Sequence, residues 1–167
     1  VPSGNPVNPD AQGLYFAHLK NSGTYYHARV GLLSPTGAGD FALAISETSD
    51  MGAGASWAPD LSFDTDYQVV ISWDAATADC TLWLDPVDMS SASIVTTGAF
   101  TGDLMEGFAL RQSSDYTGFI TIDNVIVGKP FADVNSGGPS GPGMPYCPGD
   151  GTGTACPCAA FGGSGEG

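Results

Sequence analysis

The chain has 167 residues, a formal net charge of −14, and only four basic residues against eighteen acidic ones. A hydrophobic fraction of 42% is enough to build a core, which excludes a wholly disordered protein. The acidic balance disfavours nucleic acid and anionic membranes as partners, and no apolar run approaches the roughly 20 residues needed for insertion into a membrane. We expect no basic patch from so few cations.

Turns dominate the expected structure, because the chain contains 24 Gly and 12 Pro and almost no Lys. No window shows a sustained apolar period of 3.6 residues, so we expect very little helix. Nothing from Val1 onward resembles a signal peptide. We interpret the chain as a processed or partial product of a longer precursor, so this absence says little about secretion.

The first half predicts a series of strands. Residues 1–13 contain three prolines and predict an extended lead-in, and the β-sandwich domain is expected over residues 14–131. Its first two strands are 14–20 and 25–33, joined by turn residues. A third strand, 40–47, alternates Phe41, Leu43 and Ile45 inward with Ala42, Ala44 and Ser46 outward. These small outward side chains would let another layer or partner approach closely.

The second half predicts a central hairpin, 67–74 with 79–85, then a short apolar piece at Ile94 and Val95 and a strand at 106–112. The most strand-like stretch of the chain, 119–127, is expected to close the sheet. Its interior Asp123-Asn124 pair requires a bulge, a turn or a bound cation. About eight strands with Gly-rich turns predict an all-β, antiparallel sandwich of jelly-roll type.

The C-terminal part has a different composition. Residues 132–144 predict a Gly/Ser/Pro linker, and residues 145–167 a small tail stapled by cysteines. We expect disulfides in an oxidising compartment, and zinc is the alternative, for which no nearby His completes a common ligand set. The predicted disulfide cysteines are Cys80, Cys147, Cys156 and Cys158.

Catalytic chemistry finds little support. Glu47 and Glu106 lie in no pattern that places two acids together on one strand face, and nucleophile-elbow, zinc-protease and phosphate-loop motifs are missing. Cys80 has no companion His in its sequence context. His18 and His27 are either a ligand pair or half-buried strand residues with a backbone partner, and the second interpretation is favoured. We expect no enzyme activity.

Calcium is the expected cofactor, because hard cations prefer carboxylate and carbonyl oxygens from loops. Asp60, Asp64 and Asp66 lie close together in the sequence, with Asp64 and Asp66 at ligand spacing. Asp123 and Asn124 are the second candidate pair. The alternative is that all of these are solvated turn residues.

Four aromatic side chains are candidates for stacking on a glycan: Trp57, Trp83, Tyr25 and Tyr26. Trp57 lies in a loop rich in Gly, Ala and Ser, where it either stacks on a sugar ring or covers the end of its own core.

The hairpin and the last strands together resemble the second half of concanavalin A-like, laminin-G-like jelly-roll domains of large secreted proteins from environmental bacteria. The matching positions are Trp83 and Pro86, Arg111 and Gln112, and Asp123 with Gly128. The tail CPGDGTGTACPC resembles a short motif of secreted proteins from planctomycete-like bacteria. This resemblance implies secretion or a cell-surface location, and places Asp123-Asn124 where many carbohydrate-binding jelly rolls hold calcium.

The chain departs from that family because it supplies about eight strands instead of about a dozen. Either an N-terminal half is missing, or another chain supplies strands to an incomplete sandwich. We therefore expect a structural or adhesive extracellular module that forms homo-oligomers, or binds a neighbouring chain, by strand or tail exchange, with a filament or surface layer as the product. The alternative function is a carbohydrate-binding module of a larger secreted protein.

Overall fold

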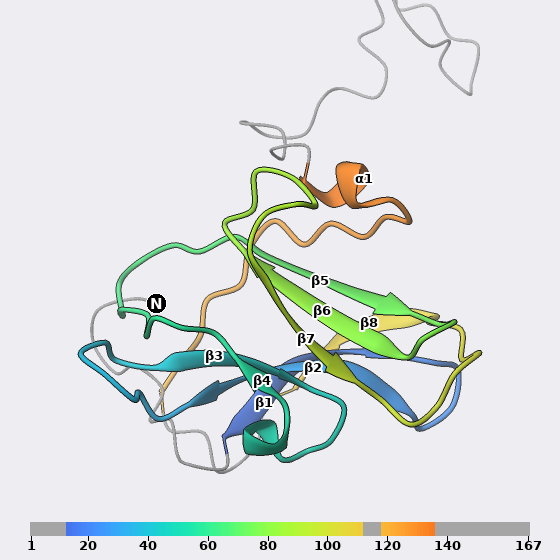
Figure 1. Ribbon diagram of the computed structural model, residues 1–167, viewed down its shortest axis with the longest axis horizontal. Coiled ribbons are helices and arrows are strands. Elements are labelled where there is room, and N and C mark those ends of the chain that lie inside the picture. Colours follow the sequence, from blue (N-terminus) through green and yellow to red (C-terminus); the bar gives the residue numbers. More distant parts are fainter. Residues whose placement is uncertain (1–12, 112–117, 136–167) are drawn as a thin grey trace, which may run out of the picture. The chain divides into compact units, whose positions relative to one another are not determined.

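A computed structural model describes residues 13–111 and 118–135, and the described chain is mostly β-strand with almost no helix (Figure 1). By its internal contacts the chain divides into two units, Val1–Asn135 and Ser136–Gly167. The lead-in, the tail and the tail cysteines Cys147, Cys156 and Cys158 lie outside the described residues.

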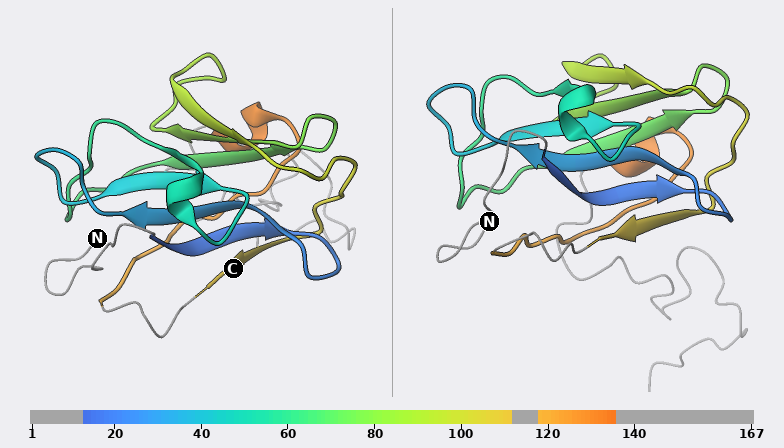
Figure 2. Two further views of the ribbon diagram at one scale, coloured as in Figure 1. Left: turned by 60° about the horizontal axis from the view of Figure 1, so that its bottom comes forward. Right: turned by 90° about the horizontal axis from the view of Figure 1, so that it is seen from below.

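Five antiparallel strands form the first sheet, in the order β4-β3-β2-β1-β8. Their bounds are β1 Leu14–Lys20, β2 Tyr26–Leu33, β3 Ala42–Ser46, β4 Ala55–Ser56 and β8 Gly107–Leu110. Four of them, β3, β2, β1 and β8, are seen side by side in the right-hand view of Figure 2. The predicted strand 14–20 is confirmed, and those at 25–33, 40–47 and 106–112 are confirmed with shorter bounds.

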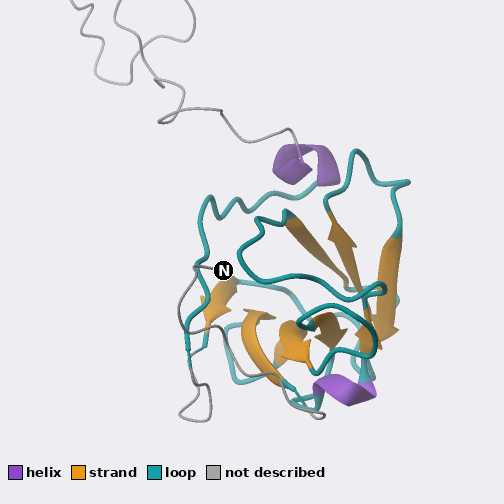
Figure 3. Ribbon diagram, turned by 90° about the vertical axis from the view of Figure 1, so that its left-hand side faces the viewer, coloured by secondary structure: helices purple, strands orange, loops and turns teal. Residues whose placement is uncertain are grey.

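Three antiparallel strands form the second sheet, β5 Val69–Asp74, β6 Asp79–Leu84 and β7 Ser93–Thr97, with β6 in the centre. The predicted hairpin is therefore confirmed, and the apolar piece at Ile94 and Val95 is the third strand. Seen from the side, strands and loops make up nearly all of the described chain, beside two short helices (Figure 3).

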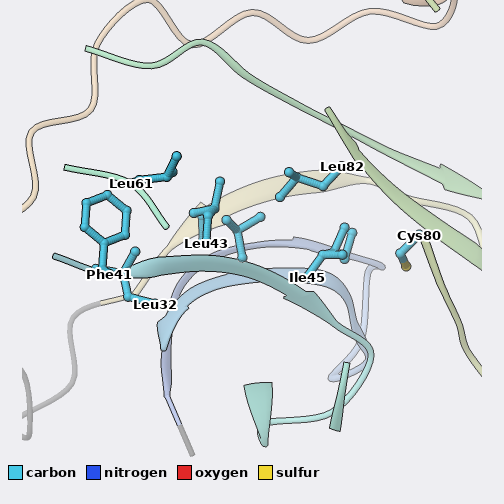
Figure 4. Close-up of a cluster of buried hydrophobic side chains, with 10 residues drawn as sticks. Leu32, Phe41, Leu43, Ile45, Leu61, Cys80 and Leu82 are labelled. Carbon is cyan, nitrogen blue, oxygen red and sulfur yellow. The ribbon is translucent and has the colours of Figure 1, made fainter. Parts of the chain in front are cut away.

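The core lies between the two sheets, in a sandwich-like arrangement. It joins Val30, Leu43 and Ile45 of the five-stranded sheet to Cys80 and Leu82 of the other. Figure 4 shows the side chains of Leu43 and Ile45 next to those of Leu82 and Cys80. The inward positions predicted for the third strand are thus confirmed. This alternation works because successive side chains of a strand point to opposite faces.

The small residues on the outer face of β3 receive a neighbour from the same chain. The 3-10 helix η1, Met51–Ala53, places Met51 against Ala44 and Tyr15 in a second buried cluster. A Cβ on Gly31 of β2 would come within 2.8 Å of Met51 and 2.6 Å of the Leu14 carbonyl oxygen. Glycine is therefore required there, and the layer expected over this face is η1.

The predicted closing strand is wrong as a strand of this chain. Phe119 forms an isolated β-bridge, but none of the described residues of 119–127 belongs to a strand of either sheet, and Phe119, Val125 and Val127 expose 49%, 54% and 77% of their surface. Ile120 alone of this stretch packs against the core. Figure 1 shows the segment, in orange, leading to the helix α1, Phe131–Asn135.

The polar pair inside that segment forms a local kink. Asn124 has a φ of 52°, in the left-handed region, and its backbone N–H donates to Asp123 Oδ1 at 2.7 Å. Asn tolerates this conformation, and Asp often accepts such a local hydrogen bond. Beyond the kink, α1 begins in the predicted sandwich and continues into the predicted linker. It packs the Phe131 ring on Trp83, with ring centres 5.0 Å apart.

Candidate functional site: a buried carboxylate and histidine network

Four polar side chains from separate elements meet at the edge of the core. His27 comes from β2, Glu47 directly follows β3, Cys80 is on β6, and Asp103 lies in the loop before β8. His27 is almost fully buried, and its ring stacks on Trp73 of the opposite sheet with centres 4.1 Å apart. The cluster therefore joins both sheets and a loop.

Each ring nitrogen of His27 faces a carboxylate. Nδ1 lies 2.7 Å from Glu47 Oε2, and Nε2 lies 3.0 Å from Asp103 Oδ2. Ionised carboxylates only accept hydrogen bonds, so an imidazolium that donates from both nitrogens satisfies both contacts. Glu47 and Asp103 expose 12% and 25% of their side chains, so both contacts with His27 are partly shielded from water.

The other oxygen of Glu47 is also occupied. Oε1 accepts from the backbone N–H of Ala28 at 2.8 Å and from the Cys80 thiol. Burial first, and then the hydrogen bond to Glu47, raise the pKa of the Cys80 thiol well above its ordinary value of 9.0. Cys80 is fully buried, so it is a protonated hydrogen-bond donor and not an exposed thiolate nucleophile.

Asp103 also accepts hydrogen bonds from residues other than His27. Asn21 Nδ2, in the turn between β1 and β2, lies 3.0 Å from each Asp103 oxygen, and Trp73 Nε1 donates to the Asp103 carbonyl at 3.2 Å. The Asn21 hydrogen bond first, and then that from His27, hold the pKa of Asp103 below its ordinary value of 3.8. The network therefore stabilises the ionised form of this carboxylate.

The lowered pKa of Asp103 predicts that the folded chain loses stability in acid. The unfolded chain takes up a proton on Asp103 at higher pH than the folded chain, so stability falls as pH drops below 3.8 and through the lower folded pKa. Asn21→Ala removes the main cause of the depression, and its unfolding midpoint should depend less steeply on pH in that window. Urea unfolding between about pH 6 and about pH 2 measures this. The same dependence of the urea midpoint on pH for Asn21→Ala and wild type would contradict this prediction. Asp66→Asn is the control, and its midpoint should depend on pH as that of wild type does.

The network was missed by sequence reasoning because of one bulge. Ala28 has a φ of 48°, and the pairing of β1 with β2 is irregular at this point. Val30 and Leu32 face the core, so strict alternation would place His27 on the outer face. The bulged Ala28 turns it inward instead. The weak signal in the sequence was the scarcity of glutamates, one of which ends a predicted strand.

The two histidines do not form a ligand pair. His27 binds carboxylates inside the sandwich, where a backbone partner had been expected, whereas His18 lies on the outer side, its ring 4.5 Å from that of Tyr26. Within residues 13–111 and 118–135, no group of three or more His, Cys, Asp or Glu side chains is placed to hold a metal ion.

The carboxylates expected to bind calcium have different surroundings. Asp60 accepts from the backbone N–H groups of Thr36, at 3.1 Å, and Gly37, and the Thr36 hydrogen bond first lowers its pKa below 3.8. Asp64 and Asp66 are exposed, and no hydrogen bond to their carboxylates is found in the described part of the chain. The Asp123 carboxylate accepts from Asn124 in the kink. Calcium stays a prediction.

The aromatic candidates separate into covered and open side chains. Trp57 is partly buried against the core, and Trp83 is buried beneath Phe131. Tyr26 packs on His18. Tyr25 exposes 55% of its surface and lies 5.5 Å, ring centre to ring centre, from the exposed Phe100. Of the four candidates, Tyr25 is therefore the open one, and it pairs with Phe100, which was not predicted.

Cys80 is a free cysteine in this structure, and the disulfide predicted to include it is not formed within the described residues. No helix in the described part of the chain is long and apolar enough to cross a bilayer. Comparison of the chain with protein-family models, with curated proteins and with solved structures finds no match.

Proposed function

We propose that this chain is a non-enzymatic extracellular structural or adhesive module, a jelly-roll domain of concanavalin A-like type, that assembles with copies of itself into a filament or surface layer. The observation that carries the proposal is the segment 119–127. Its sequence is the most strand-like of the chain, yet its described residues join neither sheet and expose apolar side chains.

Strand-forming backbone that lies outside both sheets favours pairing with another chain. Each sheet also ends in strands that have one neighbour among the described strands, β4 and β8 in one sheet and β5 and β7 in the other. An exposed edge and an exposed apolar segment are the two components of strand addition. A subunit that gives its 119–127 segment to an edge of the next copy would bury Phe119, Val125 and Val127.

The test is sedimentation velocity over a range of protein concentrations, with electron microscopy of the assembled material. Wild type should associate more strongly as salt is added, because salt screens the repulsion between chains of charge −14. Val127→Lys should weaken association by at least about tenfold, since a lysine opposes edge pairing. Val87→Lys is the matched control, because Val87 is also exposed and the charge change is equal.

A wild-type protein that stays monomeric at every concentration and salt level would contradict the proposal. Equal association of the Val127→Lys and Val87→Lys variants would show that assembly uses another surface. Calcium belongs to the proposal as a structural ion at the second candidate pair, Asp123 and Asn124, and an unchanged melting temperature in millimolar EDTA would remove it.

A carbohydrate-binding module is the second candidate. The exposed pair of Tyr25 and Phe100 favours it, because aromatic faces stack on sugar rings. A glycan array should then show binding that Tyr25→Ala abolishes and Trp57→Ala retains, since Trp57 is partly covered by its own core. If wild type binds no glycan, the carbohydrate-binding module is excluded and the structural module is the function that stands.

A further inference from the structure

Three of the four basic residues of this acidic chain gather on one sheet. Lys20 ends β1, Arg29 lies on β2, and Arg111 directly follows β8, and these three strands are neighbours in the order β2-β1-β8 (Figure 2). Together with His18, Tyr15 and Tyr26 we call them the basic face. The expectation of no basic patch is therefore wrong for the folded chain.

The two arginines of the basic face are held in place by aromatic rings. The Arg111 guanidinium carbon lies 4.4 Å from the centre of the Tyr15 ring, and that of Arg29 lies 5.4 Å from the same ring and 5.6 Å from Tyr26. Arg29 also donates Nη1 to the Glu47 carbonyl oxygen. Because both guanidinium groups contact one ring, two like charges are neighbours, and a bound anion would relieve their repulsion.

No carboxylate of the described chain neutralises these cations. The ion pairs among residues 13–111 and 118–135 are the two formed by His27, and neither includes Lys20, Arg29 or Arg111. His18 Nδ1 and Arg29 Nε are buried and have no hydrogen-bond partner there. Burial first, and then the charges of Arg29, Lys20 and Arg111, lower the pKa of His18 below 6.5. The unpaired Arg29 Nε–H donor and the uncompensated positive charge are characteristic of a surface that binds an anion.

We propose that the basic face binds the loop 60–66 of a second copy of this chain, through Asp64 and Asp66. This inference rests on the proposed self-assembly and adds the charged contact that directs it. Charge complementarity carries it, since every copy has eighteen acidic residues and only four basic ones.

The loop 60–66 offers two free carboxylates on a fixed support. Leu61 pairs with Phe41, and the Phe63 backbone N–H donates to Asp40 Oδ2 at 2.8 Å. Most other described aspartates use their carboxylates on their own chain, as Asp79, Asp88 and Asp103 do. Asp64 and Asp66 are exposed, have no such partner in the described part, and stand two residues apart to meet two neighbouring guanidinium groups.

The two surfaces lie on different parts of the five-stranded sheet. The loop is joined to Phe41, just before β3, whereas the basic face covers β2, β1 and β8. A contact between two different surface patches that is not made reciprocally within one pair leaves each copy with one free patch of each kind, so it repeats from head to tail. Such a contact extends an assembly when the rotation between successive copies does not close it as a ring.

Variants with equal net charge test this contact. At a salt concentration at which wild type self-associates, Arg111→Gln should weaken self-association about tenfold, since one charged partner is lost. Lys129→Gln carries the same charge change away from the basic face and should associate as wild type does. Lys20→Gln is a second variant on the face, in case the loss of Arg111 from the Tyr15 ring lowers the melting temperature.

A charge exchange identifies the occupant. Arg111→Glu and Asp66→Lys should each lose self-association, and an equimolar mixture should recover it, because each variant then finds its complement in the other. A mixture that stays dissociated, or Arg111→Gln that associates as Lys129→Gln does, overturns the proposal. If Val127→Lys disrupts assembly and Arg111→Gln does not, the proposal of strand pairing is supported and the basic face is excluded as a contact. If Arg111→Gln disrupts assembly and Val127→Lys does not, the basic face is supported and strand pairing through 119–127 is excluded. Binding of polygalacturonate that Arg111→Gln abolishes, with association unchanged, assigns the face to an acidic polysaccharide instead.

Discussion

Replacing His27 with phenylalanine is expected to lower the free energy of unfolding by about 3–5 kcal/mol. The substitution fills the same space against Trp73 and removes both ring nitrogens from the Glu47 and Asp103 carboxylates. Glu47 is then a shielded carboxylate that has lost the hydrogen bond to His27 Nδ1, and this is the source of the penalty. Urea unfolding followed by tryptophan fluorescence measures it.

A second substitution separates the lost charge from lost packing. Adding Glu47→Leu to His27→Phe removes the unpaired carboxylate and should recover part of the stability, because apolar replacement of both partners of a buried pair is often tolerated. His18→Phe is the matched control, since the His18 ring is buried with an unpartnered Nδ1 and no carboxylate. Equal losses for His18→Phe and His27→Phe would show that the network contributes no more than ring packing.

Leu82→Ala is expected to cost about 2–5 kcal/mol, the usual range for a leucine deleted from a closed core. Leu82 is fully buried in the central strand of the three-stranded sheet and belongs to the cluster that joins the two sheets. The missing methyl groups would leave a cavity between the layers, which rigid strands cannot fill by moving.

The shift in the urea midpoint at constant slope gives the size of this effect. Val95→Ala on β7 is the control, because Val95 is half exposed and its loss should cost under about 1 kcal/mol. A Leu82→Ala protein as stable as Val95→Ala would mean that the two sheets do not share one core.

The sequence predicted those elements of the fold that nearby residues determine, and it failed where an element needs a distant partner. Strand β1 and the hairpin of β5 and β6 followed from alternation and turn residues, which act over a few positions. The segment 119–127 has the same local signals but no partner strand among the described residues. A strand is stabilised by pairing, which apolar and β-branched composition favours but cannot supply.

The candidate sites depended even more on distant contacts. Glu47 and Asp103 reach His27 from positions 20 and 76 residues away in the chain. One bulged residue, Ala28, decides which face of the sheet His27 occupies. Alternation by itself would therefore place His27 on the outer face, because a bulge reverses the parity of every side chain beyond it.

The sequence by itself determined the all-β class, the low helix content and most strand positions, because each follows from composition and from periods of two residues. The tertiary structure alone decided that the most strand-like segment stays outside both sheets, that His27 lies between two carboxylates, and that Lys20, Arg29 and Arg111 form one face. Strand order produced that face, since β8 pairs with β1 across a long separation in the chain. Pairing between strands far apart in the chain depends on the whole fold, so it cannot be predicted from a local sequence pattern.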